Sequence, residues 1–463
     1  MRPGCRVVLP PDAGLEHEGE GPALACGGMT SPPAPLSVDA AGADLRAFVD
    51  ASPTPVHAVA EITRRLRGAG FTELAEVDRW ALAPGDQRYV VRDGGSVVAF
   101  RVGTAPLADA GARLVGTHTD SPTFKVRPRY DVRRAGLKLV GVEPYGGLLA
   151  HTWLDRELTV AGRLATRDGG LHRVVLPGAP LRLPSLAIHL DRGVRDGLVL
   201  DPQRHLVPVW GPESADDLVE ALALVAGVPY ADVVGHDLVL TDSLPAAETG
   251  ADGSWVAAPR LDNLGSCHSA TLALLAVEPS EHTQVVVAND HEEVGSGSAE
   301  GARGSFLADV LARLVAATSG TDGARPYDPQ DLHRAVARSR LVSADMAHAV
   351  HPNHTDRHEP QHAPVLGGGP VLKLNANQAY ATDGGTGGWF TARCADAGVP
   401  LQHFVSRADL PCGSTIGPLT ATRLGIPTVD VGSPLLGMHS CRELVSARDV
   451  PLMVAALTAC LSV

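Results

Sequence analysis

At 463 residues, the chain is longer than one hydrophobic core usually organises, so its length predicts two domains or one domain with a large insertion. A composition of 44% hydrophobic and 20% charged residues is that of a soluble globular protein. The formal net charge of −13, without any basic run, argues against a protein that binds nucleic acid, because phosphate-binding surfaces need clustered Lys and Arg.

The cysteines and the apolar stretches indicate the compartment. Seven cysteines are scattered without a CxxC spacing, which is typical of buried thiols in a reducing compartment rather than of a disulfide framework. No apolar stretch reaches the roughly 18–20 residues needed to cross a bilayer. The segment up to Pro35 also lacks the apolar core of a signal peptide. We therefore expect a cytoplasmic protein with no membrane partner.

The first ordered elements are expected from about Asp44, after a Gly- and Pro-rich extension, residues 1–43, that we predict to be disordered. Two short helices follow, broken at Pro53 and Pro55. The segment RYVVRDGGSVVAFRVG predicts a hairpin with its turn at residues 93–95. The next segment, ARLVGTHTDSP, predicts a short apolar strand that runs into a polar end.

The middle third, residues 125–256, changes character. Short β-rich pieces such as LKLVGVE, LTVAGRLATR, LHRVVLP and DLVLTDSLP are separated by Gly and Pro turns, with one helix expected at residues 216–225. From Pro259 onward strands and helices alternate, which predicts an α/β fold, a sheet with helices on both faces. We therefore predict a catalytic domain formed by residues 44–124 and 257–463, with the β-rich middle third inserted between its two halves.

Acidic residues and histidines gather where the predicted strands end. In an open α/β sheet, the carboxyl ends of the strands form the crevice in which ligands bind. The candidates, in chain order, are His118 and Asp120 in GTHTDS, Asp262 in RLDN, Glu292 and Glu293 in NDHEEVG, Asp345 in SADMAH, and His439 in GMHS. Because residues two apart on a strand point the same way, Asp120 can reach the far ring nitrogen of His118 and fix its tautomer for metal binding.

Each of these motifs alone also has an ordinary structural explanation. The HTD segment could be a buried His–Asp hydrogen bond without a metal, and Asp262 could simply cap a helix, which is the commoner role of Asp at such a position. Adjacent glutamates at a strand end form a solvated turn in most proteins. A lone histidine such as His439 is more often structural than ligating.

Together, however, the motifs form a ligand set for two divalent metal ions. Imidazole combined with carboxylate suits zinc or a neighbouring first-row metal. Two ions about 3.5–4 Å apart need a bridging carboxylate and one or two further ligands each. Asp262 would bridge the two ions. His118 and Asp345 would be the further ligands of one ion, and Glu293 and His439 those of the other. Glu292 then remains free as a general base.

Other chemistries lack their motifs in this sequence. There is no GxSxG elbow and no P-loop, and the HEPQH segment at residues 358–362 is interrupted by Pro360, so it does not form an HExxH helix. The glycine runs at residues 367–369 and 384–385 lack the preceding strand of a dinucleotide fingerprint. The histidines between His348 and His362 are interrupted by prolines. We therefore interpret that stretch as an ordered loop lining the cleft rather than as a further metal site.

The order of the motifs resembles that of the aspartyl aminopeptidases, a family of two-zinc metallo-aminopeptidases. The resemblance runs from about Asp44 to the C-terminus and rests on HTDSPTFKVRP, HTWLDRELTVAGR, PSLAIHLDR, RLDNLGSC, NDHEEVGSGS, SADMAHAVHPNHTDRHEPQHAP, GPVLKLNANQAYATD, LPCGSTIGP and DVGSPLLGMHSCREL. It implies release of N-terminal, preferably acidic, amino acids from peptides by two ions per subunit, zinc or else manganese or cobalt. It gives the ligands above the same roles, with Glu292 as the base and Asp120 orienting His118.

The same resemblance implies how subunits assemble and select substrates. Family members insert a dimerisation domain into an α/β catalytic domain, which matches residues 125–256, and they form tetrahedral dodecamers. His189 matches a histidine offered to a neighbouring subunit's active site, although it could be an ordinary strand histidine. Lys373 matches the residue expected to face the acidic side chain of the substrate, because a partly buried cation selects for Asp or Glu.

Two rival functions remain open at this point. A hydrolase of other amides, such as acylated amino acids, would use the same metals, and activity confined to N-blocked compounds would identify it. A non-catalytic assembly or cargo-binding protein could also retain the fold. Such a protein would not need to keep both a base and a full ligand set, so we favour an aminopeptidase that acts on peptides as a homo-oligomer.

Overall fold

The structure, a computed structural model, describes residues 37–318 and 328–463. Most of the predicted extension, residues 1–43, lies outside the described residues, but helix α1 spans Val38–Asp50 and so starts before Asp44. The Ser37 side chain caps this helix by accepting a hydrogen bond from the backbone N–H of Ala40. Ala41 in its first turn is fully buried, so packing holds the early turn in place.

A nine-stranded mixed sheet forms the centre of the α/β part. In spatial order its strands are β1 (Thr72–Glu73), β2 (Gln87–Arg92), β3 (Ser96–Arg101), β13 (Thr283–Asn289), β4 (Ala112–His118), β14 (Arg340–Ala344), β18 (Thr428–Gly432), β16 (Val371–Leu374) and β17 (Gln402–Val405). Strands β13, β4, β14 and β18 run parallel, so their carboxyl ends meet at one edge of the sheet. Strands β2 and β3 form the hairpin that the sequence predicted.

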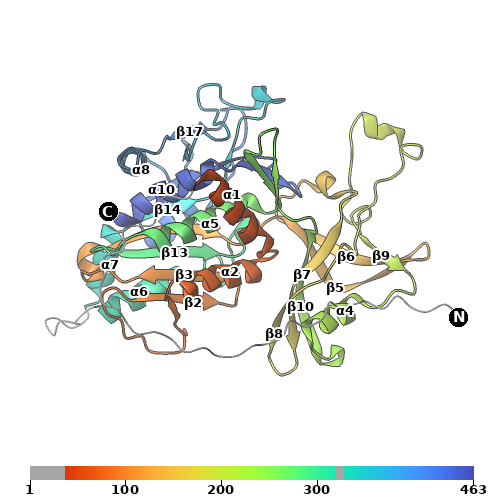
Figure 1. Ribbon diagram of the computed structural model, residues 1–463, viewed down its shortest axis with the longest axis horizontal. Helices are drawn as coiled ribbons and strands as arrows, with labels where there is room; N and C mark the ends of the chain where they lie inside the picture. Colours follow the sequence, from red (N-terminus) through yellow and green to blue (C-terminus); the bar gives the residue numbers. More distant parts are fainter. Residues whose placement is uncertain (1–36, 319–327) are drawn as a thin grey trace, which may run out of the picture. The chain divides into compact units, whose positions relative to one another are not determined.

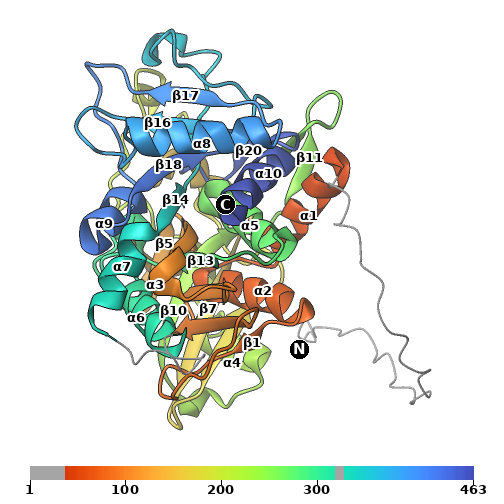
Figure 2. The same ribbon diagram turned by 90° about the vertical axis from the view of Figure 1, so that its left-hand side faces the viewer.

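Helices cover both faces of this sheet, which confirms the predicted α/β class (Figure 1). One face carries α1, α2 (Pro55–Gly68), α5 (Leu261–Ala276), α8 (Gly384–Asp396) and α10 (Asp449–Ser462). The other face carries α3 (Leu107–Ala110), α6 (Phe306–Thr318), α7 (Gln330–Arg338) and α9 (Ile416–Leu424). Figure 2 shows α1, α5 and α10 beside one another on the first of these faces.

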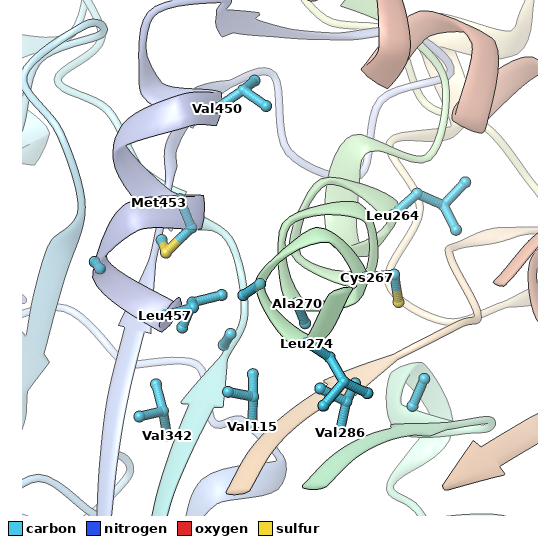
Figure 3. Packing of buried hydrophobic residues seen from close by; sticks show 14 of the residues in the cluster. Val115, Leu264, Cys267, Ala270, Leu274, Val286, Val342, Val450, Met453 and Leu457 are labelled. Carbon is cyan, nitrogen blue, oxygen red and sulfur yellow. The ribbon is translucent and has the colours of Figure 1, made fainter. Parts of the chain in front are cut away.

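Neighbouring residues of the central strands point into opposite hydrophobic layers. Leu114, Val285 and Leu341 pack among the residues of α6. Their successors in the chain, among them Val115 and Val286, pack under α5 and α10, as Figure 3 shows. Strands buried on both faces contain continuous apolar runs, such as VVVA within the segment TQVVVAN of β13.

A separate six-stranded antiparallel sheet holds most of the β-rich middle third and occupies the right of Figure 1. Its strands, in spatial order, are β8 (Leu171–Val175), β7 (Leu158–Thr166), β10 (Val233–Asp242), β5 (Thr123–Arg134), β6 (Leu137–Tyr145) and β9 (Val209–Pro212). It has a hydrophobic cluster of its own, to which helix α4 (Leu218–Ala226) contributes. The domain boundaries and the role of this region in dimerisation stay predictions.

A third sheet of five strands joins segments from several parts of the chain. Its strands, in spatial order, are β11 (Ala247–Thr249), β12 (Trp255–Ala258), β20 (Glu443–Ser446), β19 (Pro434–Leu436) and β15 (Ala347–His348). Among the described residues, no helix combines the length and the apolar character that crossing a membrane requires. The cytoplasmic location stays a prediction from the sequence.

Candidate metal centre

Three parallel strands of the main sheet bring most of the predicted site together. Strand β4 ends at His118, strand β13 is followed by the 3-10 turn Glu292–Val294, and strand β14 is followed by Asp345. Because these strands are adjacent and parallel, the residues meet at one edge of the sheet. Asp262 joins them from the first turn of α5, and His439 joins them from the loop that follows β19.

His118, Asp262 and Asp345 form the first group of potential metal ligands. His118 Nε2 lies 3.6 Å from Asp262 Oδ1 and 3.6 Å from Asp345 Oδ1. All three side chains are buried, and one ligating atom from each lies within 4.8 Å of the others. Ligands held at about 2.1 Å from a tetrahedral zinc ion stand about 3.4 Å apart, so the spacing suits a single ion.

Asp262, Glu293 and His439 form a second group. His439 Nε2 lies 3.3 Å from Asp262 Oδ2 and 3.4 Å from Glu293 Oε1. Asp262 therefore belongs to both groups and turns one carboxylate oxygen toward each histidine. Asp262 Oδ1 is buried and has no hydrogen-bond partner among the described residues. A buried carboxylate oxygen without a donor is costly, and a divalent cation would satisfy it, so the donors fit two cations that share Asp262.

Asp120 holds the two groups in position without belonging to either. Its Oδ1 lies 3.3 Å from Nδ1 of His118, which leaves Nε2 of the ring facing the candidate ligands. The hydroxyl of Tyr145 donates a 2.6 Å hydrogen bond to Asp120 Oδ2. The backbone N–H groups of Glu292 and Glu293 donate to the same carboxylate at 3.0 and 3.1 Å. Burial opposes ionisation of Asp120, but His118 and Tyr145 outweigh it and lower the pKa of this carboxyl.

Glu443 is a site residue that the motif analysis missed. It begins strand β20, is buried, and accepts a 2.9 Å hydrogen bond from the backbone N–H of Asp262 and a 2.7 Å bond from that of His439. Burial and the nearby charge of Asp262 raise the pKa of Glu443 to about 8. The sequence signal that could have identified Glu443 is its place in the segment SCREL, four residues after His439.

The carboxyl groups of the site resist ionisation when no cation balances them. Burial raises the pKa of Glu292 to about 7, against the opposing effect of His118. Burial and the charge of Asp262 raise the pKa of Glu293 well above its ordinary value. Asp120 and Asp345 are the exceptions: the pKa of Asp120 is lowered as described above, and Lys373 and His118 overcome the effect of burial and lower the pKa of Asp345. This electrostatic pattern suits a site that binds positive charge.

The two ligand groups line a cavity of about 320 Å³. Lys373 lies in its wall, 3% exposed, with Nζ 4.0 Å from Asp345 Oδ2 and 5.5 Å from the centre of the Tyr380 ring. Of the histidine-rich stretch only His348 lines this cavity. His189 does not line it either, since it lies in an exposed turn and not in a strand.

Comparison with known proteins agrees with this geometry. Residues 48–460 match the family described as aminopeptidase I zinc metalloprotease (M18). A probable M18 family aminopeptidase 2 of Mycobacterium tuberculosis is 48% identical over 427 residues, which cover 90% of this chain and 96% of the relative. A chain of the Ape4 and Nbr1 complex superposes with a TM-score of 0.86 at 36% identity, covering 91% of this chain and 85% of that chain. The mApe1 dodecamer of S. cerevisiae gives a TM-score of 0.78 at 28% identity, covering 90% and 95%.

Proposed function

The chain belongs to the M18 family of zinc metallo-aminopeptidases, and on that premise we propose that it releases N-terminal acidic residues from peptides by means of two divalent ions per subunit. One observation carries the proposal: Asp262 is shared by two groups of ligating atoms, each of which also contains a histidine and a second carboxylate. A shared carboxylate between two such groups is the arrangement that a two-metal hydrolase needs.

We assign the ligands by that sharing. His118, Asp262 and Asp345 would hold one ion, and Asp262, Glu293 and His439 would hold the other. Zinc suits imidazole and carboxylate donors best, with manganese or cobalt as alternatives. When bound, such ions lower the pKa of a coordinated water molecule and polarise the scissile carbonyl group.

Glu292 is the proposed general base. Its backbone is fixed by the hydrogen bond to Asp120, while its carboxylate accepts no hydrogen bond from any other residue of the described ranges. A pKa of about 7 lets this carboxyl exchange protons near neutral pH. Glu292 would take a proton from the attacking water and deliver it to the amine that leaves, and Asp120 would serve by orienting His118.

Lys373 is the proposed determinant of the acidic preference. It is the buried cation of the cavity wall, and an Asp or Glu side chain of the substrate that reached its ammonium group would form a charge-assisted hydrogen bond away from bulk water. A neutral side chain at the same place would leave the lysine with only Asp345 as a distant counter-charge. That difference in binding is the physical basis of selection.

Assembly into a homo-oligomer follows from the β-rich region. The segment around His189 exposes apolar side chains that a single subunit leaves in water, among them Leu186, Leu190 and Val199. We propose that a neighbouring subunit covers this segment, with residues 125–256 mediating the contact. His189 would then enter the neighbour's cavity. A dodecamer like that of mApe1 is the proposed form.

Initial rates on a set of single-residue amides test the proposal. With zinc, manganese or cobalt added, the amides of Asp and Glu should be hydrolysed faster than those of Leu and Ala, and a chelator should abolish hydrolysis. Equal rates for acidic and neutral residues would remove the acidic preference. Activity confined to N-blocked compounds would instead identify a hydrolase of acylated amino acids, and failure to bind metal on reconstitution would contradict the metal-dependent chemistry.

A further inference from the structure

Asp290, His291 and Glu300 form a further group of ligating side chains that the proposed function does not use. One ligating atom from each lies within 4.8 Å of the other two. The three side chains line a cavity of about 260 Å³ that shares no lining residue with the cavity of the candidate metal centre. Asp290 and Glu300 are each only 8% exposed, so both carboxylates are withdrawn from solvent.

Within the described part of the chain, the Asp290 carboxylate accepts a hydrogen bond at only one of its two oxygens. Its Oδ1 accepts a 2.7 Å hydrogen bond from the backbone N–H of His291. Its Oδ2 accepts no hydrogen bond from any described residue and lies 3.9 Å from His291 Nε2. A carboxylate oxygen in such surroundings needs a proton donor or a cation.

His291 is oriented in the way that metal-binding histidines are. Its Nδ1 lies 2.9 Å from the hydroxyl of Ser298, which fixes the ring and leaves Nε2 facing Asp290. A hydrogen bond to one ring nitrogen is the usual means of setting the tautomer that presents the other nitrogen to a metal.

Gly95, in the turn between β2 and β3, brings the two carboxylates together. Its backbone N–H donates a 3.1 Å hydrogen bond to Glu300 Oε2. A Cβ atom at this position would lie 2.4 Å from Asp290 Oδ2 and 2.4 Å from Glu300 Oε2. The two oxygens therefore converge on a space that only glycine leaves open.

Two cationic side chains of the same cavity pair with a different carboxylate, and a third, Arg260, donates hydrogen bonds to Thr241 and to backbone carbonyl groups. Lys125 Nζ lies 3.3 Å from Asp237 Oδ1, and Arg163 Nε lies 3.0 Å from Asp237 Oδ2. Within the described ranges, no Lys or Arg nitrogen lies within 4.0 Å of Asp290 or Glu300. The two converging carboxylates are thus left without a protein counter-charge in contact.

We propose that Asp290, His291 and Glu300 bind a third divalent cation of the first transition series. An imidazole with two carboxylates suits zinc or manganese better than magnesium or calcium, which prefer oxygen ligands alone. Asp290 and His291 directly precede Glu292 and Glu293 in the chain, and Gly95 belongs to the β2–β3 hairpin. The ion would link the β2–β3 hairpin, the loop that contains Glu300 and the turn that contains Glu292 and Glu293. It would thereby position Glu292 and Glu293, which face the peptide.

Zinc titration of the metal-free full-length protein, with bound zinc counted by elemental analysis, tests the proposal. The wild type should bind three zinc ions per subunit, whereas Asp290→Asn and Glu300→Gln should bind two. Asp237→Asn is the matched control, because it removes a carboxylate from the same cavity and should retain three. An equal count in the wild type and the Asp290→Asn variant would overturn the proposal.

A second variant separates loss of the metal site from loss of the fold. His291→Ala removes a side chain that is about a third exposed, so the fold should tolerate it. The rise in Tm that follows the addition of a third equivalent of zinc should occur in the wild type and in Asp237→Asn, and it should be absent in His291→Ala. A full rise in His291→Ala would overturn the assignment. Neither readout depends on peptide hydrolysis. The absolute count rests on the two ions of the proposed function, but the loss of one ion in Asp290→Asn and not in Asp237→Asn tests the third site alone.

Discussion

The α/β part of the molecule buries polar groups, whereas the β-rich part exposes apolar side chains. At the strand ends of the α/β part, polar groups such as His118 and Asp262 are almost wholly buried, 1% and 3% exposed. In the β-rich part, Leu190 and Val199 are 75% and 86% exposed. Burying charge is costly without a counter-charge, and exposing clustered apolar surface is costly without a partner. This contrast supports our proposal that the first region binds ions and that a neighbouring subunit covers the second.

The largest effect should come from the residue shared by both ligand groups. Asp262→Asn removes one anionic bridge from two groups at once, so both ions should be lost and kcat/KM should fall more than about 10⁴-fold. Bound zinc and the rate on an Asp amide measure this. If Asp262→Asn kept both ions and most of the rate, the proposal that Asp262 is shared by two ions in the α/β part would be wrong.

Glu292→Gln should separate catalysis from metal binding. Loss of the general base should lower kcat by about 10²–10⁴-fold, while the ions stay bound because Glu292 is not one of their proposed ligands. The matched control is Glu281→Gln, which alters a largely exposed glutamate before β13 and should leave kcat unchanged. Near-normal hydrolysis by Glu292→Gln with full metal content would show that the base assignment is wrong.

Lys373→Met should test the proposed acidic preference by removing the buried lysine from the wall of the substrate cavity. A buried charge-assisted hydrogen bond contributes about 1.5–3 kcal/mol, so the preference for Asp over Leu amides should fall about 10–100-fold. The measurement is the ratio of kcat/KM for the two amides, with metal content as the control for an intact site. An unchanged ratio would assign the selection to other residues.

Metal affinity should depend on pH through His439. Burial lowers the pKa of this ring, but the carboxylates of Asp262 and Glu293 outweigh that effect and raise it to about 9. The metal-free ring is therefore protonated at pH 7 and must release its proton to become a ligand. Zinc affinity should fall at least about tenfold for each pH unit below 9, because any other ligand that is protonated in the metal-free site must also release its proton, and titrations between pH 7 and 9 measure it. An affinity that is constant over this range would contradict the role of His439.

The smallest effect on a single subunit should come from the β-rich part. Leu190→Ser with Val199→Ser should change the free energy of unfolding of the subunit by less than about 0.5 kcal/mol for each site, because both side chains are already exposed. The mass of the assembly in solution should nevertheless decrease. Val77→Ser, which alters a 94% exposed valine of the α/β part, is the control and should leave the mass unchanged. Equal masses for the wild type, the Leu190→Ser/Val199→Ser variant and Val77→Ser would contradict the proposal that this surface forms a subunit contact.

The sequence predicted the parts of the site that depend on strand order. His118, Glu293 and Asp345 directly follow or end apolar runs, and parallel neighbouring strands must bring such residues to one edge of the sheet. The alternating pattern likewise predicted helices on both faces.

The contacts that the sequence could not predict are those made between different sheets and loops. Glu443 reaches Asp262 and His439 from the third sheet through backbone N–H groups, which carry no sequence signal. Glu300 meets Asp290 only because Gly95 of a distant hairpin leaves space for both.

Zinc-edge anomalous diffraction from crystals of the zinc-reconstituted protein tests the central claim most directly. The account predicts two peaks in the larger cavity, one beside His118 and Asp345 and one beside Glu293 and His439, with Asp262 between them. A single peak there, no peak, or a pair of peaks that Asp262 does not touch would contradict the shared two-ion centre on which the proposed chemistry depends.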